Sequence, residues 1–174
     1  DKVIKVAKRL KKKDWVRLSI DAAKESTFKA SHNPKIKVMR KDILAKAKEL
    51  KRENPLISLG YSFVIVWKGA EINGKRLLPN INEMAEATRL ARGNLFDYIS
   101  FKPCLVRLKR TQKESLLHKV DEKEEERLRI KVRKSLEKAK KAAGNRVKVL
   151  ESVNLTAILN NETDALKQQP AKCH

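Results

Sequence analysis

The sequence predicts a helix-rich α+β fold, in which a small β-sheet or hairpin is followed by two short helices and a long basic C-terminal helix. Residues 56–67 (LISLGYSFVIVW) are dominated by β-branched and aromatic side chains, which favours a central strand or hairpin with Gly60 at a bend or bulge. Asn73-Gly74 favours a tight hairpin between short strands. Apolar residues recur at helical spacing from Leu128 to Ala143, within a helix expected over 115–143 and capped by Gly144.

A length of 174 residues suits one domain with extensions or two small domains. We expect a basic N-terminal arm or helix over 1–41 and a mixed α/β nucleic-acid-binding domain over 42–110. A long charged helix and a C-terminal tail would then occupy 111–174.

The N-terminal range contains two basic segments. Residues 2–13 (KVIKVAKRLKKK) place apolar side chains on one helical face, so they predict either a helix on phosphates or an anionic membrane, or a surface helix packed on its own core. Residues 35–41 (KIKVMRK) alternate and predict a short strand or a basic arm. Asp42 is then a good N-cap for a helix that Asn54-Pro55 ends.

The charge of the chain indicates a polyanionic partner. Lys and Arg number 42 against 21 Asp and Glu, which gives a formal net charge of +21. Nucleic acid is the expected partner, because each neutralised phosphate releases condensed counterions. Basic residues extend from Lys2 to Lys172, whereas a protein of the membrane surface concentrates them in one patch, so we expect no membrane partner.

Residues 81–100 (INEMAEATRLARGNLFDYIS) predict two short helices joined by a tight turn. Met84, Ala85, Leu90, Leu95 and Tyr98 are spaced to bury one face of each helix against the other. The segment resembles the helix-turn-helix unit of repressor-type DNA-binding proteins, although Arg89 occupies the turn position usually held by glycine. The resemblance implies a recognition helix starting at Ala91, with Arg89, Arg92 and Asn94 at base edges or phosphates.

Further basic residues are expected to grip the phosphate backbone. They fall just beyond the expected recognition helix, in the basic arm, and at the end of the first basic segment. These candidates are Lys102, Arg107, Lys109, Arg110, Lys35, Lys37, Arg40, Lys41, Lys11, Lys12 and Lys13.

No catalytic or cofactor site is expected. Three histidines and two cysteines are scattered without metal-ligand spacing, and no glycine-rich phosphate loop is present. The enzyme class most compatible with the charge is a metal-dependent nuclease, for which Glu71 and Glu83 are the nearby carboxylates, although ordinary surface charge is the preferred interpretation. Two cysteines and no apolar run of membrane-spanning length predict an intracellular, reducing compartment such as the cytoplasm, nucleoid or an organelle matrix.

Three functions therefore stay open. The first is DNA binding through the helix-turn-helix-like unit, with basic arms on phosphates. The second, ranked nearly equal, is a structural RNA-binding component of a ribosome or another ribonucleoprotein complex. The third is a polyanion-binding or membrane-surface module. Aromatic residues appear too few and too scattered for base stacking, so Tyr61 and Phe63 are assigned to the core. The long helix offers an alternative role in forming a homodimer.

Overall fold

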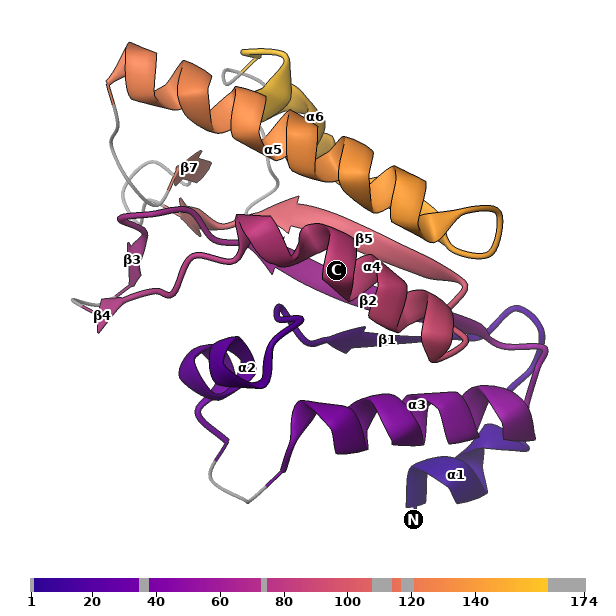
Figure 1. Ribbon diagram of the computed structural model, residues 1–174. Coiled ribbons are helices and arrows are strands. Elements are labelled where there is room, and N and C mark those ends of the chain that lie inside the picture. The colour runs from indigo at the N-terminus through magenta and orange to yellow at the C-terminus, as the bar shows by residue number, and fades with distance from the viewer. Residues whose placement is uncertain (1, 35–37, 73–74, 108–113, 117–120, 163–174) are drawn as a thin grey trace.

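The computed structural model describes residues 2–34, 38–72, 75–107, 114–116 and 121–162 (Figure 1). Their centre is a parallel four-stranded sheet in the order β1-β2-β5-β8. These strands are β1 (Trp15–Ser19), β2 (Ser58–Ile65), β5 (Tyr98–Pro103) and β8 (Lys148–Glu151). A mixed α/β fold is thus confirmed, with the sheet parallel because helices connect its strands.

Helices supply each crossover between neighbouring strands. The helices of the described chain are α1 (Lys2–Ala7), α2 (Glu25–His32), α3 (Arg40–Glu53), α4 (Met84–Gly93), α5 (Glu122–Ala143) and α6 (Val153–Leu159), with a 3-10 turn at Ile81–Glu83 before α4. Helix α1 precedes β1 and α6 follows β8, so the crossovers are made by α2 to α5. Figure 1 shows α3, α4 and α5 running opposite to the strands, with α4 in front of β2 and beside α5. Two antiparallel pairs complete the described strands: β3 (Glu71–Ile72) with β4 (Lys75–Arg76), and β6 (Leu105–Arg107) with β7 (Glu114–Leu116).

The core lies between the helices and one face of the sheet. Tyr61, Phe63, Ile99 and Phe101 alternate along β2 and β5, and all four are fully buried. Because successive strand residues point to opposite faces, these side chains define the helical face of the sheet. Val132, Leu136, Ala139 and Ala143 form the buried stripe of α5 against the same core, at the helical spacing expected from sequence.

One core cluster extends from Ala7 to Leu159, so all three ranges distinguished in the sequence contribute to it. The range 1–41 supplies β1, and the range 111–174 supplies β8. The long helix expected over 115–143 is α5, which begins at Glu122. It connects β5 to β8, and α6 follows β8. No described helix combines the length and the apolar character that crossing a bilayer would need.

The expected pair of helices over 81–100 is wrong. Only α4 is helical, and Tyr98 begins strand β5. The helix ends because Leu95 takes a left-handed φ of 63°, and the Phe96 N–H donates to the Ala91 carbonyl at 3.0 Å, a bond typical of helix C-terminal caps. The apolar residues beyond this point follow strand spacing: Ile99 and Phe101 point into the core, and Tyr98 points away from it.

Three smaller expectations also need correction. Helix α3 begins at Arg40, two residues before the expected cap, and the Asp42 carboxylate accepts the Met39 N–H at 3.3 Å from inside the first turn. Gly60 is regularly paired with Arg17 and Tyr98 and is not a bulge. The first basic segment is helical only to Ala7, and in residues 35–41 the described part is two residues of coil followed by the start of α3.

Candidate nucleic-acid interface

The second face of the sheet differs sharply from the helical face. We call it the open face and define it by the outward-pointing residues of the four strands. These are Trp15, Arg17, Ser19, Ser58, Gly60, Ser62, Val64, Tyr98, Ser100, Lys102, Lys148 and Leu150. Trp15, Arg17, Ser19 and Lys148 are exposed on its two edge strands, and Val64, Tyr98, Lys102 and Leu150 are half-buried.

Two aromatic side chains lie on the open face beside cations. Trp15 is 61% exposed, and the Arg17 guanidinium carbon lies 5.2 Å from the centre of its ring. The Tyr98 ring lies across Gly60, since a Cβ atom at Gly60 would come within 2.1 Å of the ring carbon Cζ. Glycine at this position therefore lets the tyrosine side chain cross the neighbouring strand.

Positive charge is in excess on the open face. Arg17, Lys102 and Lys148 belong to it, and none of its residues is a carboxylate. Burial lowers the pKa of Lys102, and the nearby Arg17 lowers it further, whereas Asp21 acts in the opposite direction. An anion bound here would relieve the repulsion between these cations.

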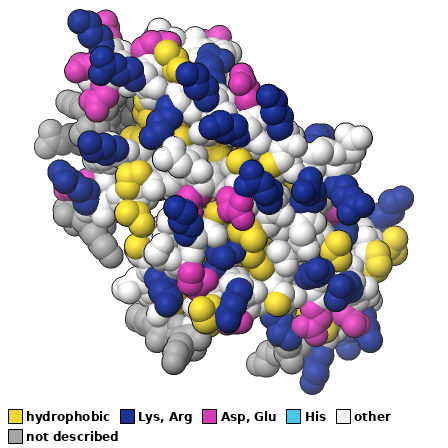
Figure 2. Space-filling model, viewed as in Figure 1, with side chains coloured by type: hydrophobic (Ala, Val, Ile, Leu, Met, Phe, Trp, Pro, Cys, Tyr) yellow, Lys and Arg dark blue, Asp and Glu magenta, His cyan; other side chains and the backbone are white. Residues whose placement is uncertain are grey.

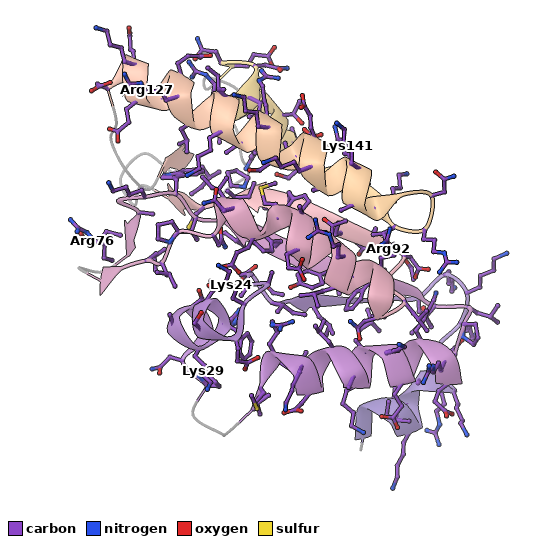
Figure 3. The ribbon with its side chains drawn as sticks, in the orientation of Figure 1. Lys24, Lys29, Arg76, Arg92, Arg127 and Lys141 are labelled. Carbon is purple, nitrogen blue, oxygen red and sulfur yellow. The ribbon has the colours of Figure 1, made fainter. Side chains whose placement is uncertain are left out.

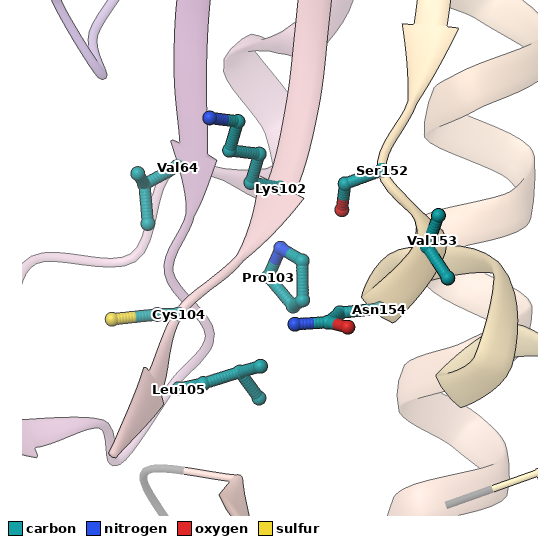
Figure 4. Close-up of a pocket in the computed structure, with 8 residues that line it drawn as sticks. All are labelled: Val64, Lys102, Pro103, Cys104, Leu105, Ser152, Val153 and Asn154. Carbon is teal, nitrogen blue, oxygen red and sulfur yellow. The ribbon is translucent and has the colours of Figure 1, made fainter. Parts of the chain in front are cut away.

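A hollow of ≈ 460 Å³ continues the open face beyond the carboxyl ends of its strands. Figure 4 shows the Lys102 side chain reaching from β5 toward β2. Cys104 and Leu105, just after β5, also line the hollow, and Ser152 and Asn154 lie across it. Burial raises the pKa of the Cys104 thiol to about 11, so the thiol is a poor nucleophile at neutral pH. Ligands of open α/β sheets commonly bind at this end of the strands.

The opposite end of the sheet is strongly basic. Basic residues precede all four strands, and because parallel strands start at one edge, these residues gather there. We call this set the basic edge: Lys11, Lys12, Lys13, Arg52, Arg92 and Arg146, all exposed. Arg52 and Arg92 lie in the last turns of α3 and α4, where the helix dipole favours cations.

Three arginines of the basic edge surround one hollow of ≈ 550 Å³. Arg52, Arg92 and Arg146 line it together with Lys51 and Asp97. The Asp97 carboxylate is already engaged, because it accepts the Leu59 N–H at 2.6 Å and the Lys51 ammonium at 2.8 Å. Figure 3 places Arg92 and Lys141 toward the C-terminal ends of their helices, and Lys24 and Lys29 at the other end of the molecule.

The helical side of the molecule has a more mixed surface. Figure 2 shows Lys and Arg side chains spread over it with Asp and Glu between them. Many of these charges pair locally, as in Arg89 with Glu86 at 2.5 Å and Arg129 with Glu125 at 3.0 Å. Both pairs reduce the local excess of positive charge, and the exposed pair of Arg89 with Glu86 contributes little stability.

The residues expected to read DNA are not on a recognition helix. Arg89 is paired with Glu86 on α4, and Arg92 belongs to the basic edge. Asn94 is the C-cap of α4, and its side-chain amide donates to the Leu90 carbonyl at 2.8 Å. In this structure the Asn94 side chain caps the C-terminus of α4.

The other expected phosphate contacts lie in several separate parts of the chain. Lys11, Lys12 and Lys13 lie at the basic edge just before β1, and Lys102 is on the open face. Lys41 is exposed on α3, whereas Arg40 is half-buried with its Nε atom 3.8 Å from the Glu25 carboxylate, so it is a packing residue. Arg107 ends β6, and Lys35, Lys37, Lys109 and Arg110 lie outside the described residues.

Neither carboxylate considered for a nuclease lies in a metal-binding cluster. Glu83 is buried, and its carboxylate accepts the Ala23 N–H at 2.7 Å, the Lys24 N–H at 2.9 Å and the Thr27 hydroxyl at 2.5 Å. It caps the first turn of α2 from a distant part of the chain and is not ordinary surface charge. Within the described ranges, no three His, Cys, Asp or Glu side chains are grouped to hold a metal ion.

Sequence reasoning missed Trp15, Arg17, Tyr98 and Lys148. A signal for three of them exists in the period-two alternation of WVRLS and YISFK, which places Trp15 with Arg17 and Tyr98 with Lys102. Only the strand order brings the two segments onto one face.

Comparisons with protein-family models, curated proteins and solved structures find no match for this chain.

Proposed function

We propose that this chain is a non-enzymatic nucleic-acid-binding protein, of the kind that packs against RNA in a ribonucleoprotein complex. The observation that carries the proposal is the basic edge, where one end of a parallel sheet concentrates cations from four separate segments. Phosphate contacts from such a surface position a protein on nucleic acid without reading its sequence.

Two observations favour RNA over the major groove of duplex DNA. The segment expected to form the recognition helix is the end of α4 followed by strand β5, so it offers no second helix for the groove. The basic edge is a broad surface with a hollow between Arg52, Arg92 and Arg146, which suits an irregular phosphate backbone.

A salt titration tests the proposal with a matched pair of variants. The Arg92→Ala/Arg146→Ala double variant removes two cations from the basic edge, and Lys24→Ala/Lys29→Ala removes two exposed cations from the opposite end. Each lost phosphate contact should reduce the slope of log K against log salt by roughly 0.7 to 0.9. We therefore expect the slope to fall by about 1.5 for the arginine variant and to change little for the lysine variant.

The control works because the two variants have the same net charge. At physiological salt the Debye length is about 8 Å, so a charge at the far end of the molecule acts weakly on a phosphate at the basic edge. Equal losses for both variants would locate binding elsewhere. If the wild-type protein binds neither structured RNA nor duplex at low salt, the proposed function is wrong.

A further inference from the structure

We propose that the open face binds single-stranded nucleic acid, with unpaired bases stacked on Trp15 and Tyr98. This inference rests on the proposed nucleic-acid function and adds the class of ligand and the surface that takes it. The parallel sheet gives the first reason. Such sheets normally have both faces covered, and here one face leaves Trp15, Arg17, Ser19 and Lys148 exposed.

The two rings are far enough apart to take two separate bases of one nucleic-acid chain. Arg17, Gly60, Tyr98 and Lys148 form one row across the four strands, and Trp15 lies two residues earlier on β1. From standard strand dimensions, the Cα atoms of Trp15 and Tyr98 are separated by about 12 Å along a flat surface. On the intervening strand β2, the Tyr98 ring covers Gly60, and the small Ser58 side chain is the neighbour of Trp15.

The chemistry of the open face selects nucleic acid over a protein partner. An obligate protein interface has an apolar core, and here Val64 and Leu150 are the aliphatic residues of the face. Its other members are aromatic rings, hydroxyls, a glycine and the cations Arg17, Lys102 and Lys148. Rings for bases beside cations for phosphates are the components of sequence-tolerant single-strand binding.

The two carboxylates that flank β1 are already engaged. Asp14 precedes β1, and its side chain accepts the Lys11 N–H at 2.7 Å. Asp21 follows β1, and its side chain accepts the Val64 N–H at 2.7 Å and the Ser19 hydroxyl at 3.1 Å. These partners hold both carboxylates in place at the ends of β1, where Asp21 offsets part of the charge of the nearby Lys102. The three cations Arg17, Lys102 and Lys148 still outnumber this one carboxylate.

The ligand is single-stranded because a duplex hides the faces of its bases. Stacking on Trp15 and Tyr98 requires bases that are splayed out of a helix. The basic edge continues this path, since Lys11, Lys12 and Lys13 immediately precede Trp15. A single nucleic-acid chain that crosses the open face can therefore keep its phosphates on the basic edge while its bases stack on the rings of Trp15 and Tyr98.

Tryptophan fluorescence and equilibrium binding test the proposal in the full chain. Trp15 is exposed and Trp67 is 3% exposed, so quenching by a bound base reports on Trp15, and Trp15→Phe identifies the background from Trp67. The ligands are an oligouridylate, the abasic ribose-phosphate chain of the same length, and an RNA duplex. We expect the oligouridylate to quench Trp15 and to bind more tightly than the abasic chain.

The variants are chosen to separate stacking from folding. Trp15→Ala and Tyr98→Ala should each weaken oligouridylate binding by about fivefold or more and leave abasic binding unchanged. Trp15→Phe and Tyr98→Phe should retain most of the affinity, because they keep a ring. Ile130→Ala removes a comparably exposed apolar side chain from α5 and should have no effect.

The outcomes distinguish the two proposals. Equal affinity for oligouridylate and the abasic chain, with no effect of Trp15→Ala or Tyr98→Ala, overturns stacking and leaves the phosphate-binding function standing. Binding of polyglutamate or anionic vesicles as tightly as oligouridylate, with the same loss in Trp15→Ala, assigns the open face to another polyanion and also overturns the inference. Absence of binding to every nucleic acid removes both proposals.

Discussion

Replacing Glu83 by alanine should destabilise the fold through the first turn of α2. The carboxylate accepts hydrogen bonds from the Ala23 N–H, the Lys24 N–H and the Thr27 hydroxyl, and it is buried. A buried donor left without a partner costs about 1 to 3 kcal/mol. Water entering the vacated space would recover part of this, so Glu83→Ala should lower the free energy of unfolding by about 3 to 5 kcal/mol.

Glu83→Gln should be milder, because the amide keeps the shape of the carboxylate. Its oxygen can accept the two backbone N–H groups that Oε2 now accepts, and its nitrogen can donate to the Thr27 oxygen. Only the charge is lost, so about 1 to 2 kcal/mol is expected. For a chain of this size, these values correspond to falls in Tm of roughly 6 to 20 °C for alanine and 2 to 8 °C for glutamine.

Urea denaturation followed by circular dichroism measures both variants. Glu86→Ala is the matched control, since Glu86 is an exposed glutamate on α4 paired with Arg89, and its loss should change stability by no more than about 0.5 kcal/mol. If Glu83→Ala costs no more than Glu86→Ala, the carboxylate does not hold α2. If glutamine costs as much as alanine, the charge and not the hydrogen-bond geometry is decisive.

Three further measurements follow from buried polar groups. Asn80→Ala should lower the free energy of unfolding in urea by about 2 to 4 kcal/mol, because the Asn80 amide donates to the Asp21 and Val64 carbonyls at 2.8 Å. A loss of stability under about 1 kcal/mol would contradict this prediction. Burial raises the pKa of Asp21 above its ordinary value of 3.8, so the protonated carboxyl stabilises the fold at low pH and this stabilisation is lost as the pH rises through the folded pKa. Asp21→Asn should therefore become more stable relative to wild type between about pH 3 and about pH 7. A difference in the free energy of unfolding that does not change with pH would refute this prediction. In a Cys173→Ser background, alkylation of Cys104 at neutral pH should be much slower in the folded protein than in urea, as its pKa is raised to about 11 by burial, and equal rates would show an accessible thiol.

Local patterns were reliable where one interaction dominates. The β-branched run at 56–67 contains β2, and the apolar residues of 128–143 recur at the spacing that forms the buried stripe of α5. Both were predictable because a buried face requires apolar residues at a regular spacing along the chain. The prediction of a second helix after α4 was wrong, because the spacing of Leu95, Phe96 and Tyr98 is compatible with both a helix and a strand. Its conformation was decided by a left-handed Leu95 and by pairing of β5 with two neighbours.

The sequence alone determined the charge of the chain, the strand within 56–67 and the apolar stripe of the long helix. Strand order decided the rest, because contacts between distant segments are not encoded in any local period. Parallel pairing gathered Lys11 to Lys13, Arg52, Arg92 and Arg146 at one edge. The same pairing placed Trp15 and Tyr98, which are far apart in sequence, on one face of the sheet.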